Sequence, residues 1–306
     1  MTAALVLEQV LNGLQLGVML FLTAAGLTLV FGVMGLINLA HGSLFMTGAF
    51  VCAWVAGTTG SFLAGLVAGA LAAAAAGAVV ELLVIRRLYD RDHLDQVLAT
   101  FALILIFSEG ARWVFGAQPL WLDVPEALSG ALTLPGGAGY PVYRLVIIGV
   151  GLAVAAALGL LISRTRLGMR IRAGESDREM IGALGVDIGR LYTVVFALGA
   201  GLAGLAGALV GALQSVQVGM GEPVLILAFV VIVIGGIGSI RGALAGAVLV
   251  GLTDTLGRVF LPMAFARVLP PAEASGVGAA VASMLIYVLM AAVLVWRPRG
   301  LFPAHG

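Results

Sequence analysis

Residues 37–48 read INLAHGSLFMTG, a polar stretch bordered by glycine inside a long apolar region of the chain. Asn38 and His41 lie three residues apart, and their neighbours are uncharged and mostly small or apolar. Burying polar groups in an apolar setting costs free energy unless they find hydrogen-bond partners. The stretch therefore marks a break between two apolar segments, and the rest of the sequence decides which solvent surrounds them.

The composition of the chain predicts a membrane protein. Of its 306 residues, 61% are hydrophobic and only 10% are charged, and the mean hydropathy is +1.15. A soluble protein carries roughly 25% charged residues, so too few polar groups remain here to cover a soluble surface. The formal net charge of +1 argues against a nucleic-acid partner, which needs a strongly basic face. The single cysteine, Cys52, excludes an internal disulfide.

Charges, prolines and polar clusters divide the chain into apolar stretches of membrane-spanning size. A bilayer core about 30 Å thick needs roughly 20 apolar residues per helix. We expect an all-α polytopic membrane protein with about 8–9 transmembrane helices or half-helices, some of them broken, in one domain covering residues 1–306. The apolar stretches are approximately 9–33, 44–57, 61–85, 96–116, 142–163, 191–213, 224–240, 242–260 and 277–296.

The distribution of arginine predicts the orientation. With nine crossings, the loops at 86–91 and 164–190, the C-terminal 297–299 and Arg241 all fall on one side. Because basic residues are enriched in cytoplasmic loops, this side is expected to be cytoplasmic. The N-terminus is then outside and the C-terminus inside. The remaining arginines fall on the outer side: Arg112, Arg144, Arg258 and Arg267.

A second break resembles the first. Residues 33–44 and 233–244 align without a gap, and a parallel internal repeat and a chance similarity between glycine-rich segments both remain open. Irregular backbone at membrane depth is tolerated only when it is buried in protein or lines a cavity. Asn38 and His41 can therefore line or gate a pathway, or Asn38 can cap the helices on either side, or the stretch can be a plain loop. The identities are Val33/Val233, Gly35/Gly235, Ile37/Ile237, Gly42/Gly242 and Leu44/Leu244.

The loop 164–190, RTRLGMRIRAGESDREMIGALGVDIGR, is the most informative polar segment. Its part 175–185 predicts a short amphipathic helix with Met180, Ile181 and Leu184 on one side and Gly185 as the C-cap. Such a helix at the cytoplasmic face suits docking into a groove of a soluble partner. Interfacial anchoring by the arginines is the alternative interpretation.

The sequence offers little support for an enzyme. Its histidines, His41, His93 and His305, form no known metal-ligand spacing, and no phosphate loop with Gly-Lys-Ser/Thr or nucleophile elbow occurs. We expect no catalytic residue, no metal and no cofactor, and any ATPase must be another chain. Carboxylates within the apolar stretches are few, which argues against an ion-coupled carrier.

Four segments together carry a family resemblance. They are FGVMGLINLAHGSLFMTGAF at 31–50, the segment 163–211, VIVIGGIGSIRGALAGAVLVG at 231–251 and WRPRGLF at 296–302. The chain resembles the LivH-type permeases of bacterial ABC importers for branched-chain amino acids. The resemblance covers nearly the whole chain, with 117–141 the least characteristic part.

The resemblance implies a multi-pass permease subunit of the bacterial inner membrane, without catalytic residues. It implies a sister permease subunit in a heterodimer, two cytoplasmic ABC ATPase subunits and an extracytoplasmic substrate-binding protein as partners. The expected substrate is leucine, isoleucine or valine, with urea, short amides or other amino acids as alternatives. A self-sufficient secondary carrier or channel for small polar solutes is the alternative function.

The resemblance also places the family's functional segments on this chain. The ATPase-coupling residues are Arg172, Ala173, Glu175, Met180, Gly182, Ala183 and Gly185. The pathway or gate candidates are Asn38, Ala40, His41 and Gly42 at the first break and Gly235, Gly236, Gly238 and Ser239 at the second.

Overall fold

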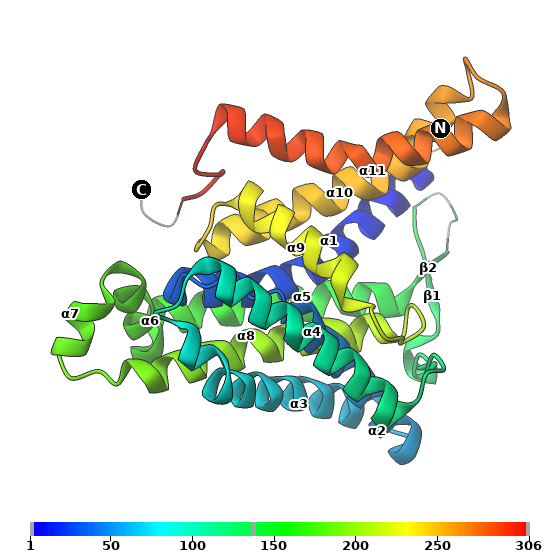
Figure 1. Ribbon diagram of the computed structural model, residues 1–306. Coiled ribbons are helices and arrows are strands. Elements are labelled where there is room, and N and C mark those ends of the chain that lie inside the picture. Colours follow the sequence, from blue (N-terminus) through cyan, green and yellow to red (C-terminus); the bar gives the residue numbers. More distant parts are fainter. Residues whose placement is uncertain (1–2, 136, 138, 304–306) are drawn as a thin grey trace. The chain divides into compact units, whose positions relative to one another are not determined.

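The computed structural model describes residues 3–135, 137 and 139–303, and these residues form eleven α-helices and one small hairpin (Figure 1). The helices are α1 (Ala3–Met34), α2 (His41–Thr59), α3 (Phe62–Leu83), α4 (His93–Phe115), α5 (Val142–Arg164), α6 (Arg166–Ser176), α7 (Arg178–Ala183), α8 (Ile188–Gly211), α9 (Gly221–Gly235), α10 (Ile240–Phe265) and α11 (Pro271–Trp296). The chain also forms two short 3-10 helices, η1 (Ile85–Leu88) and η2 (Glu126–Leu128), and the strands β1 (Ala131–Thr133) and β2 (Gly139–Pro141).

Each of the nine apolar stretches expected from the sequence corresponds to one helix, although α9 ends at Gly235, before the end of the stretch 224–240, and the predicted fold class is confirmed. Eight of the described helices are long and apolar enough to cross a membrane, and the ninth stretch, α9, has 15 residues. A 15-residue helix is about 22 Å long, which is less than a bilayer core of about 30 Å. The prediction of some half-helices therefore fits α9.

The contacts divide the chain into two units. The α2–α3–α8 unit contains residues 22–124 and 153–226, and the α10–α11 unit contains residues 1–21, 125–152 and 227–306. The boundaries pass through α1, α5 and α9, so each of these helices contributes to both units.

Close backbone contact between small residues holds the α2–α3–α8 unit together. A Cβ atom on Gly48 of α2 would overlap the backbone of Gly204 in α8, and one on Gly26 of α1 would overlap Gly199. Glycine at these positions lets the helix axes approach closely, which is the main source of packing energy between helices in lipid.

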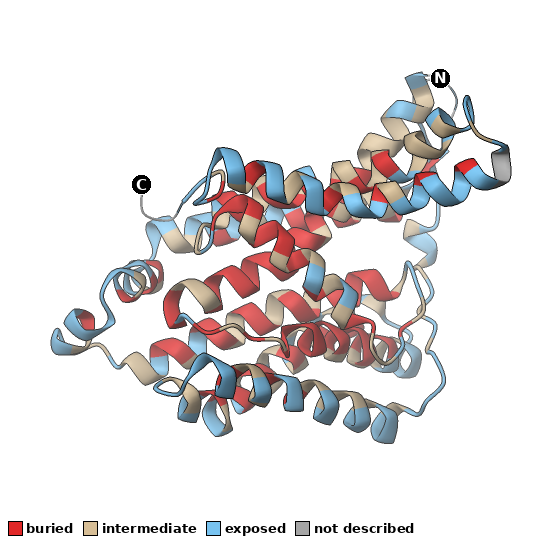
Figure 2. Ribbon diagram, turned by 45° about the horizontal axis from the view of Figure 1, so that its top comes forward, coloured by how far each residue is buried: buried red, intermediate tan, exposed pale blue. Residues whose placement is uncertain are grey.

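The α10–α11 unit is a helix pair joined by the first part of α1. In Figure 1, α10 and α11 run side by side. A Cβ atom on Gly257 of α10 would lie 3.5 Å from the Cβ atom of Ala282 in α11. Gly13 and Gly17 of α1 pack against the backbone of α10. Figure 2 shows that α11 is largely exposed along its outer face, and its exposed side chains include Met284, Val288 and Val295. A large exposed apolar face on a spanning helix indicates contact with lipid or with another subunit.

Candidate functional site

The segment between α5 and α8 contains two short helices, of which the sequence predicted one. The helix α7 lies within the predicted amphipathic helix 175–185 but is shorter, and Gly185 follows its C-cap Leu184 with φ +85°. The helix α6 was not predicted, and it includes Glu175, which the sequence analysis assigned to the later helix. We call residues 166–187 the coupling segment.

Side chains that accept backbone hydrogen bonds fix the ends of both short helices. Thr165 Oγ1 accepts from the Gly168 N–H at 3.0 Å, and Asp177 Oδ1 accepts from the N–H groups of Glu179 and Met180 at 3.0 and 2.9 Å. N-caps of this kind typically contribute about 1 kcal/mol each. The coupling segment is therefore an ordered pair of helices, which a docking surface requires.

The predicted apolar side of α7 is divided in the structure. Ile181 is buried, whereas Met180 and Leu184 are 59% and 76% exposed. Because residues 180 and 181 point about 100° apart on a helix, Ile181 can be covered while Met180 stays exposed on the same apolar side. The exposed pair Met180 and Leu184, one turn apart, forms an uncovered apolar surface bordered by the charged side chains of Arg178 and Glu179.

The coupling candidates lie together on this segment and are mostly exposed. Arg172 donates a hydrogen bond from Nη1 to the carbonyl of Ile162 in α5. A cavity of about 400 Å³ is lined by residues 32–35 at the end of α1 and by residues 174–179. The structure thus brings the coupling segment next to the first break. Arg172, Ala173, Met180, Ala183 and Gly185 are exposed, and Glu175 and Gly182 are half-buried.

The first break runs back along α1 instead of staying at the end of the helix. The helix α1 ends at Met34, Gly35 follows with φ +67°, and α2 begins at His41. His41 Nε2 lies 3.1 Å from the carbonyl oxygen of Thr23, eleven residues before the end of α1. Eleven residues correspond to about 16 Å along a helix. The start of α2 is therefore well inside the length of α1.

Asn38 organises this re-entrant turn. Its Oδ1 accepts a hydrogen bond from the Ala40 N–H at 3.0 Å, and its carbonyl accepts one from the His41 N–H at 3.3 Å. Ala40 is the N-cap residue of α2 and has no side chain that can accept a capping bond. Asn38 and His41 are both fully buried within the chain, and Gly42 packs against Gly221 at the start of α9.

The second break is shorter and is covered by the C-terminal segment. Only residues 236–239 separate α9 from α10, with φ +107° at Gly236 and +83° at Gly238. Ser239 Oγ accepts from the Gly242 N–H at 3.1 Å and so caps α10. The N–H groups of Leu301 and Phe302 donate to the carbonyls of Ile234 and Gly235, both at 2.9 Å. Gly235 is the last residue of α9, where it packs against Gly242.

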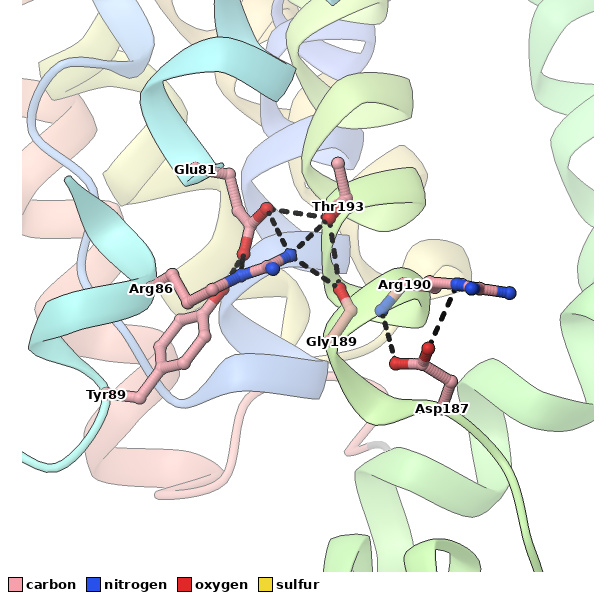
Figure 3. A network of polar contacts seen from close by, with 7 residues as sticks. All are labelled: Glu81, Arg86, Tyr89, Asp187, Gly189, Arg190 and Thr193. Atoms are coloured by element: carbon pink, nitrogen blue, oxygen red, sulfur yellow. Dashed lines mark hydrogen bonds and ion pairs between the residues drawn. The ribbon is translucent and has the colours of Figure 1, made fainter. Parts of the chain in front are cut away.

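A buried ion pair, which the sequence analysis did not identify, lies at the end of α3 (Figure 3). The Glu81 carboxylate is 0% exposed and accepts two hydrogen bonds from Arg86, from Nε and Nη2, both at 3.1 Å. Its other donors are the hydroxyl groups of Tyr89 at 2.6 Å and Thr193 at 2.7 Å. The carboxylate is thus surrounded by four donors, which compensates for its burial.

Arg86 extends this network to the first turn of α8. Its Nη2 also donates to the Gly189 carbonyl at 3.1 Å and to Thr193 Oγ1 at 2.8 Å. The Glu81 carboxylate raises the pKa of Arg86 above its ordinary value through their hydrogen bond. Burial, and then the hydrogen bond to Glu81, raise the pKa of Tyr89. The only sequence signal was a glutamate near the end of an apolar stretch, five residues before an arginine.

The side chains that could bind a metal ion are dispersed. Over the part of the chain that the structure describes, no three His, Cys, Asp or Glu side chains lie close enough together to hold one.

The sequence matches known permeases. The family model described as "Branched-chain amino acid transport system / permease component" matches residues 9–294. The permease protein BraD of the high-affinity branched-chain amino acid transport system of Pseudomonas aeruginosa is 28% identical over 96% of this chain and 95% of its own length.

The corresponding LivH permease proteins of Escherichia coli K12 and Salmonella typhimurium are each 28% identical over 83% of this chain and 87% of theirs. The family model covers far more than half of the residues, from the first turns of α1 almost to the end of α11. The chain therefore belongs to the family of permease components of branched-chain amino acid transport systems.

Proposed function

We propose that this chain is the membrane-spanning permease subunit of an ATP-driven ABC importer for leucine, isoleucine and valine. The observation that carries the proposal is the family match over residues 9–294, together with eight helices that can span a membrane. The similar proteins BraD and LivH are named as permeases of branched-chain amino acid transport systems. A family of permease components implies that other chains complete the importer.

The proposed partners are a sister permease, two cytoplasmic ABC ATPases and an extracytoplasmic binding protein. The coupling segment is the proposed ATPase contact, because it exposes Met180 and Leu184 between charged side chains outside the spans. Exposed apolar side chains on a short helix favour insertion into a groove of a partner. In this proposal ATP is hydrolysed on the partner ATPases, and this chain performs no chemistry.

The contacts suggest how movement of the ATPases reaches the spans. Only residues 184–187 connect α7 to α8, and Asp187 caps α8 by accepting from the Arg190 N–H at 3.0 Å. Pressure on α7 would therefore displace the first turn of α8, which the Glu81 network ties to α3 and η1. The cavity lined by residues 32–35 and 174–179 supports this proposal, because it lies between the start of the first break and the coupling segment.

The remaining sequence-based expectations form part of the proposal. Residues 1–306 act as one permease domain in the bacterial inner membrane, with the N-terminus outside and the C-terminus in the cytoplasm. The basic residues in and directly after the coupling segment, Arg166, Arg170, Arg172, Arg178 and Arg190, support a cytoplasmic position for it. The two breaks serve as gate elements, with Asn38, His41 and Gly42 at the first and Gly235, Gly236, Gly238 and Ser239 at the second.

Purification and reconstitution test the proposal. The chain is extracted in a mild detergent, the proteins that co-purify are identified by mass spectrometry, and the complex is placed in liposomes with a loaded binding protein. We expect two ATPases and a sister permease, and leucine accumulation that requires ATP. Accumulation against a gradient by this chain alone would instead show a self-sufficient carrier.

Competition in the same liposomes tests the substrate. Unlabelled isoleucine and valine should suppress the uptake of labelled leucine, whereas urea and a short amide should not. Suppression by urea or the amide without an effect of isoleucine would assign the importer to one of those substrates instead.

A further inference from the structure

Two helices of the α2–α3–α8 unit begin at the same place. A Cβ atom on Gly42, the second residue of α2, would lie 2.6 Å from the carbonyl oxygen of Gly221, the first residue of α9. The hydrogen-bond distance between His41 and Thr23 places this junction alongside the interior of α1. The junction therefore lies beside the middle part of a helix that can span a membrane, and not at its end.

Helix N-termini attract negative charge. The first N–H groups of a helix have no partner within the helix, and the aligned peptide dipoles add a partial positive charge. Two such ends meet at the junction of α2 and α9, so their effects add. In transporters, the N-terminal ends of discontinuous helices bind anionic substrate groups. A helix end alone does not make a site, and the decisive observation here is the state of the side chains around it.

Several polar atoms at this junction are buried without a partner. Asn38 is fully buried, and while its Oδ1 accepts from the N-cap residue Ala40, its Nδ2 has no hydrogen bond. Ser43 Oγ is also buried and without a bond. So is His41 Nδ1, which is an acceptor in neutral histidine because Nε2 donates to the Thr23 carbonyl. Because Oδ1 of Asn38 is fixed on Ala40, its amide is held at the start of α2. Buried polar groups in native proteins normally have a hydrogen-bond partner, so the three unpaired atoms need an explanation, and a bound ligand would supply one.

An acidic side chain lies at the start of the other helix. Glu222 is the second residue of α9, is half-buried, and has an Oε2 atom that is buried and without a hydrogen bond. The junction therefore combines two hydrogen-bond donors at a positive helix end, Asn38 Nδ2 and Ser43 Oγ, with a carboxylate. This pattern is complementary to a zwitterion, whose carboxylate would bind at the α2 start and whose ammonium group would pair with Glu222.

We infer that the junction of α2 and α9, with Asn38, His41, Ser43 and Glu222 around it, is a transient binding site for the α-amino and α-carboxylate groups of an amino acid during transport. The inference rests on the proposed function and names the residues that contact the substrate. The structure shows the site closed, because Gly42 and Gly221 are in contact. Opening of this contact during the ATP-driven cycle exposes the polar groups to the substrate.

The variants Ser43→Ala and Glu222→Gln test the site in the reconstituted importer. Removing a buried hydroxyl that has no partner should leave the thermal unfolding midpoint unchanged or raise it. The loss of a contact to a charged substrate should lower leucine uptake about tenfold or more, while ATP hydrolysis stays within about twofold of the wild type. Glu109→Gln, which changes an exposed carboxylate on α4, is the matched control and should transport normally.

Thiol labelling provides a readout that does not depend on the rate of uptake. Ser43→Cys is treated with a positively charged methanethiosulfonate, at rest and during ATP hydrolysis. We expect labelling only during turnover, and slower labelling when the binding protein delivers leucine. The native Cys52 is the internal control, because it is buried on α2 nine residues later, about 180° around the helix. It should remain unlabelled throughout.

The possible outcomes separate the inference from the proposed function. If wild-type importer takes up leucine but Ser43→Ala and Glu222→Gln transport normally, the polar atoms are bridged by structural water and the inference is wrong. Labelling of Ser43→Cys that leucine does not slow would also overturn it. If the wild type takes up no branched-chain amino acid, the proposed function fails first.

Discussion

Glu81 and Thr193 are 112 residues apart in sequence and their side-chain oxygens are 2.7 Å apart in space, and their hydrogen bond joins the end of α3 to the second turn of α8. Arg86 reinforces this connection from η1, because one of its nitrogens contacts the Glu81 carboxylate, Thr193 and the Gly189 carbonyl. Since α8 directly follows the coupling segment, these contacts fix the position of its start. We therefore propose that the Glu81 network holds the start of α8 in place when the coupling segment moves.

Changing either member of the Glu81–Arg86 pair should destabilise the protein, and Arg86→Met should cost more than Glu81→Gln. Arg86→Met leaves a carboxylate that is 0% exposed without its cation, whereas Glu81→Gln leaves an arginine whose side chain is 40% exposed and can be hydrated. We expect a loss of about 2 kcal/mol for Glu81→Gln. The thermal unfolding midpoint in detergent, followed by tryptophan fluorescence, shows which of the two variants is less stable.

The same two variants test this role of the Glu81 network in function. Both should raise the amount of ATP hydrolysed per leucine transported by the reconstituted complex, because the displaced coupling segment no longer moves α3. A decrease of hydrolysis and uptake by the same factor, in proportion to the amount of assembled complex, would show that the network serves stability only.

Two glycines of the coupling segment should respond differently to alanine. Gly185 has φ +85°, and a Cβ atom added to it would have nothing within 4 Å, so alanine there meets backbone strain alone, roughly 1 kcal/mol or more. Gly182 is helical, and its Cβ would be 3.6 Å from Ile188 Cγ1, an ordinary contact. Hydrogen exchange of residues 178–187 should accelerate in Gly185→Ala and slow or stay unchanged in Gly182→Ala. Equal exchange in both variants would contradict the assigned turn.

The positions of the spans could be predicted because the membrane imposes long apolar runs on the sequence. The same reasoning missed α6, since Arg166, Arg170 and Arg172 conceal its helical character in a segment that composition alone presents as a charged loop. The turn at Gly185 was predicted because glycine favours the conformation that ends a helix. Local chemistry thus identified the end of α7 but not the preceding helix α6.

The long-range contacts could not be predicted from one sequence. The hydrogen bonds between Glu81 and Thr193 and between Leu301 and Ile234 form only when the chain folds. No periodic pattern in the sequence marks either pair. The re-entrant course of the first break is a similar case. Its sequence indicated an interruption between helices, but only the contact between His41 and Thr23 shows how far α2 returns along α1.

Gly48→Ala should prevent normal packing of α2, while Gly57→Ala on the same helix should be tolerated. A Cβ on Gly48 would overlap the backbone of Gly204, which cannot move without shifting α8, whereas a Cβ on Gly57 would have nothing within 4 Å. Overpacking typically costs about 1–3 kcal/mol. The yield of monodisperse protein in size-exclusion chromatography and the thermal midpoint measure the effect. If the two variants behave alike, the close α2–α8 contact does not hold the unit together.

The C-terminal segment should stabilise the second break. A chain that ends after Arg299 lacks the N–H groups of Leu301 and Phe302, which donate to the last residues of α9. These two bonds to α9, of about 1 kcal/mol each, are lost together with the bonds that Gly300 and Leu301 make to Arg297, so the thermal midpoint should fall. A chain that ends after Pro303 keeps both bonds and is the control, and its midpoint should be that of the full chain.

Gly236→Ala, made in the full chain and in the chain that ends after Arg299, shows whether the segment acts at the break itself. In the full chain the new Cβ would lie 2.8 Å from the carbonyl oxygen of Phe302, in addition to the strain at φ +107°. Truncation removes the clash with Phe302 but keeps the strain and a 3.1 Å approach to the Arg299 carbonyl oxygen. The substitution should therefore cost less stability in the shortened chain. This non-additivity is expected only between groups in direct contact. Equal costs in both chains would mean that the segment stabilises the protein without covering the second break.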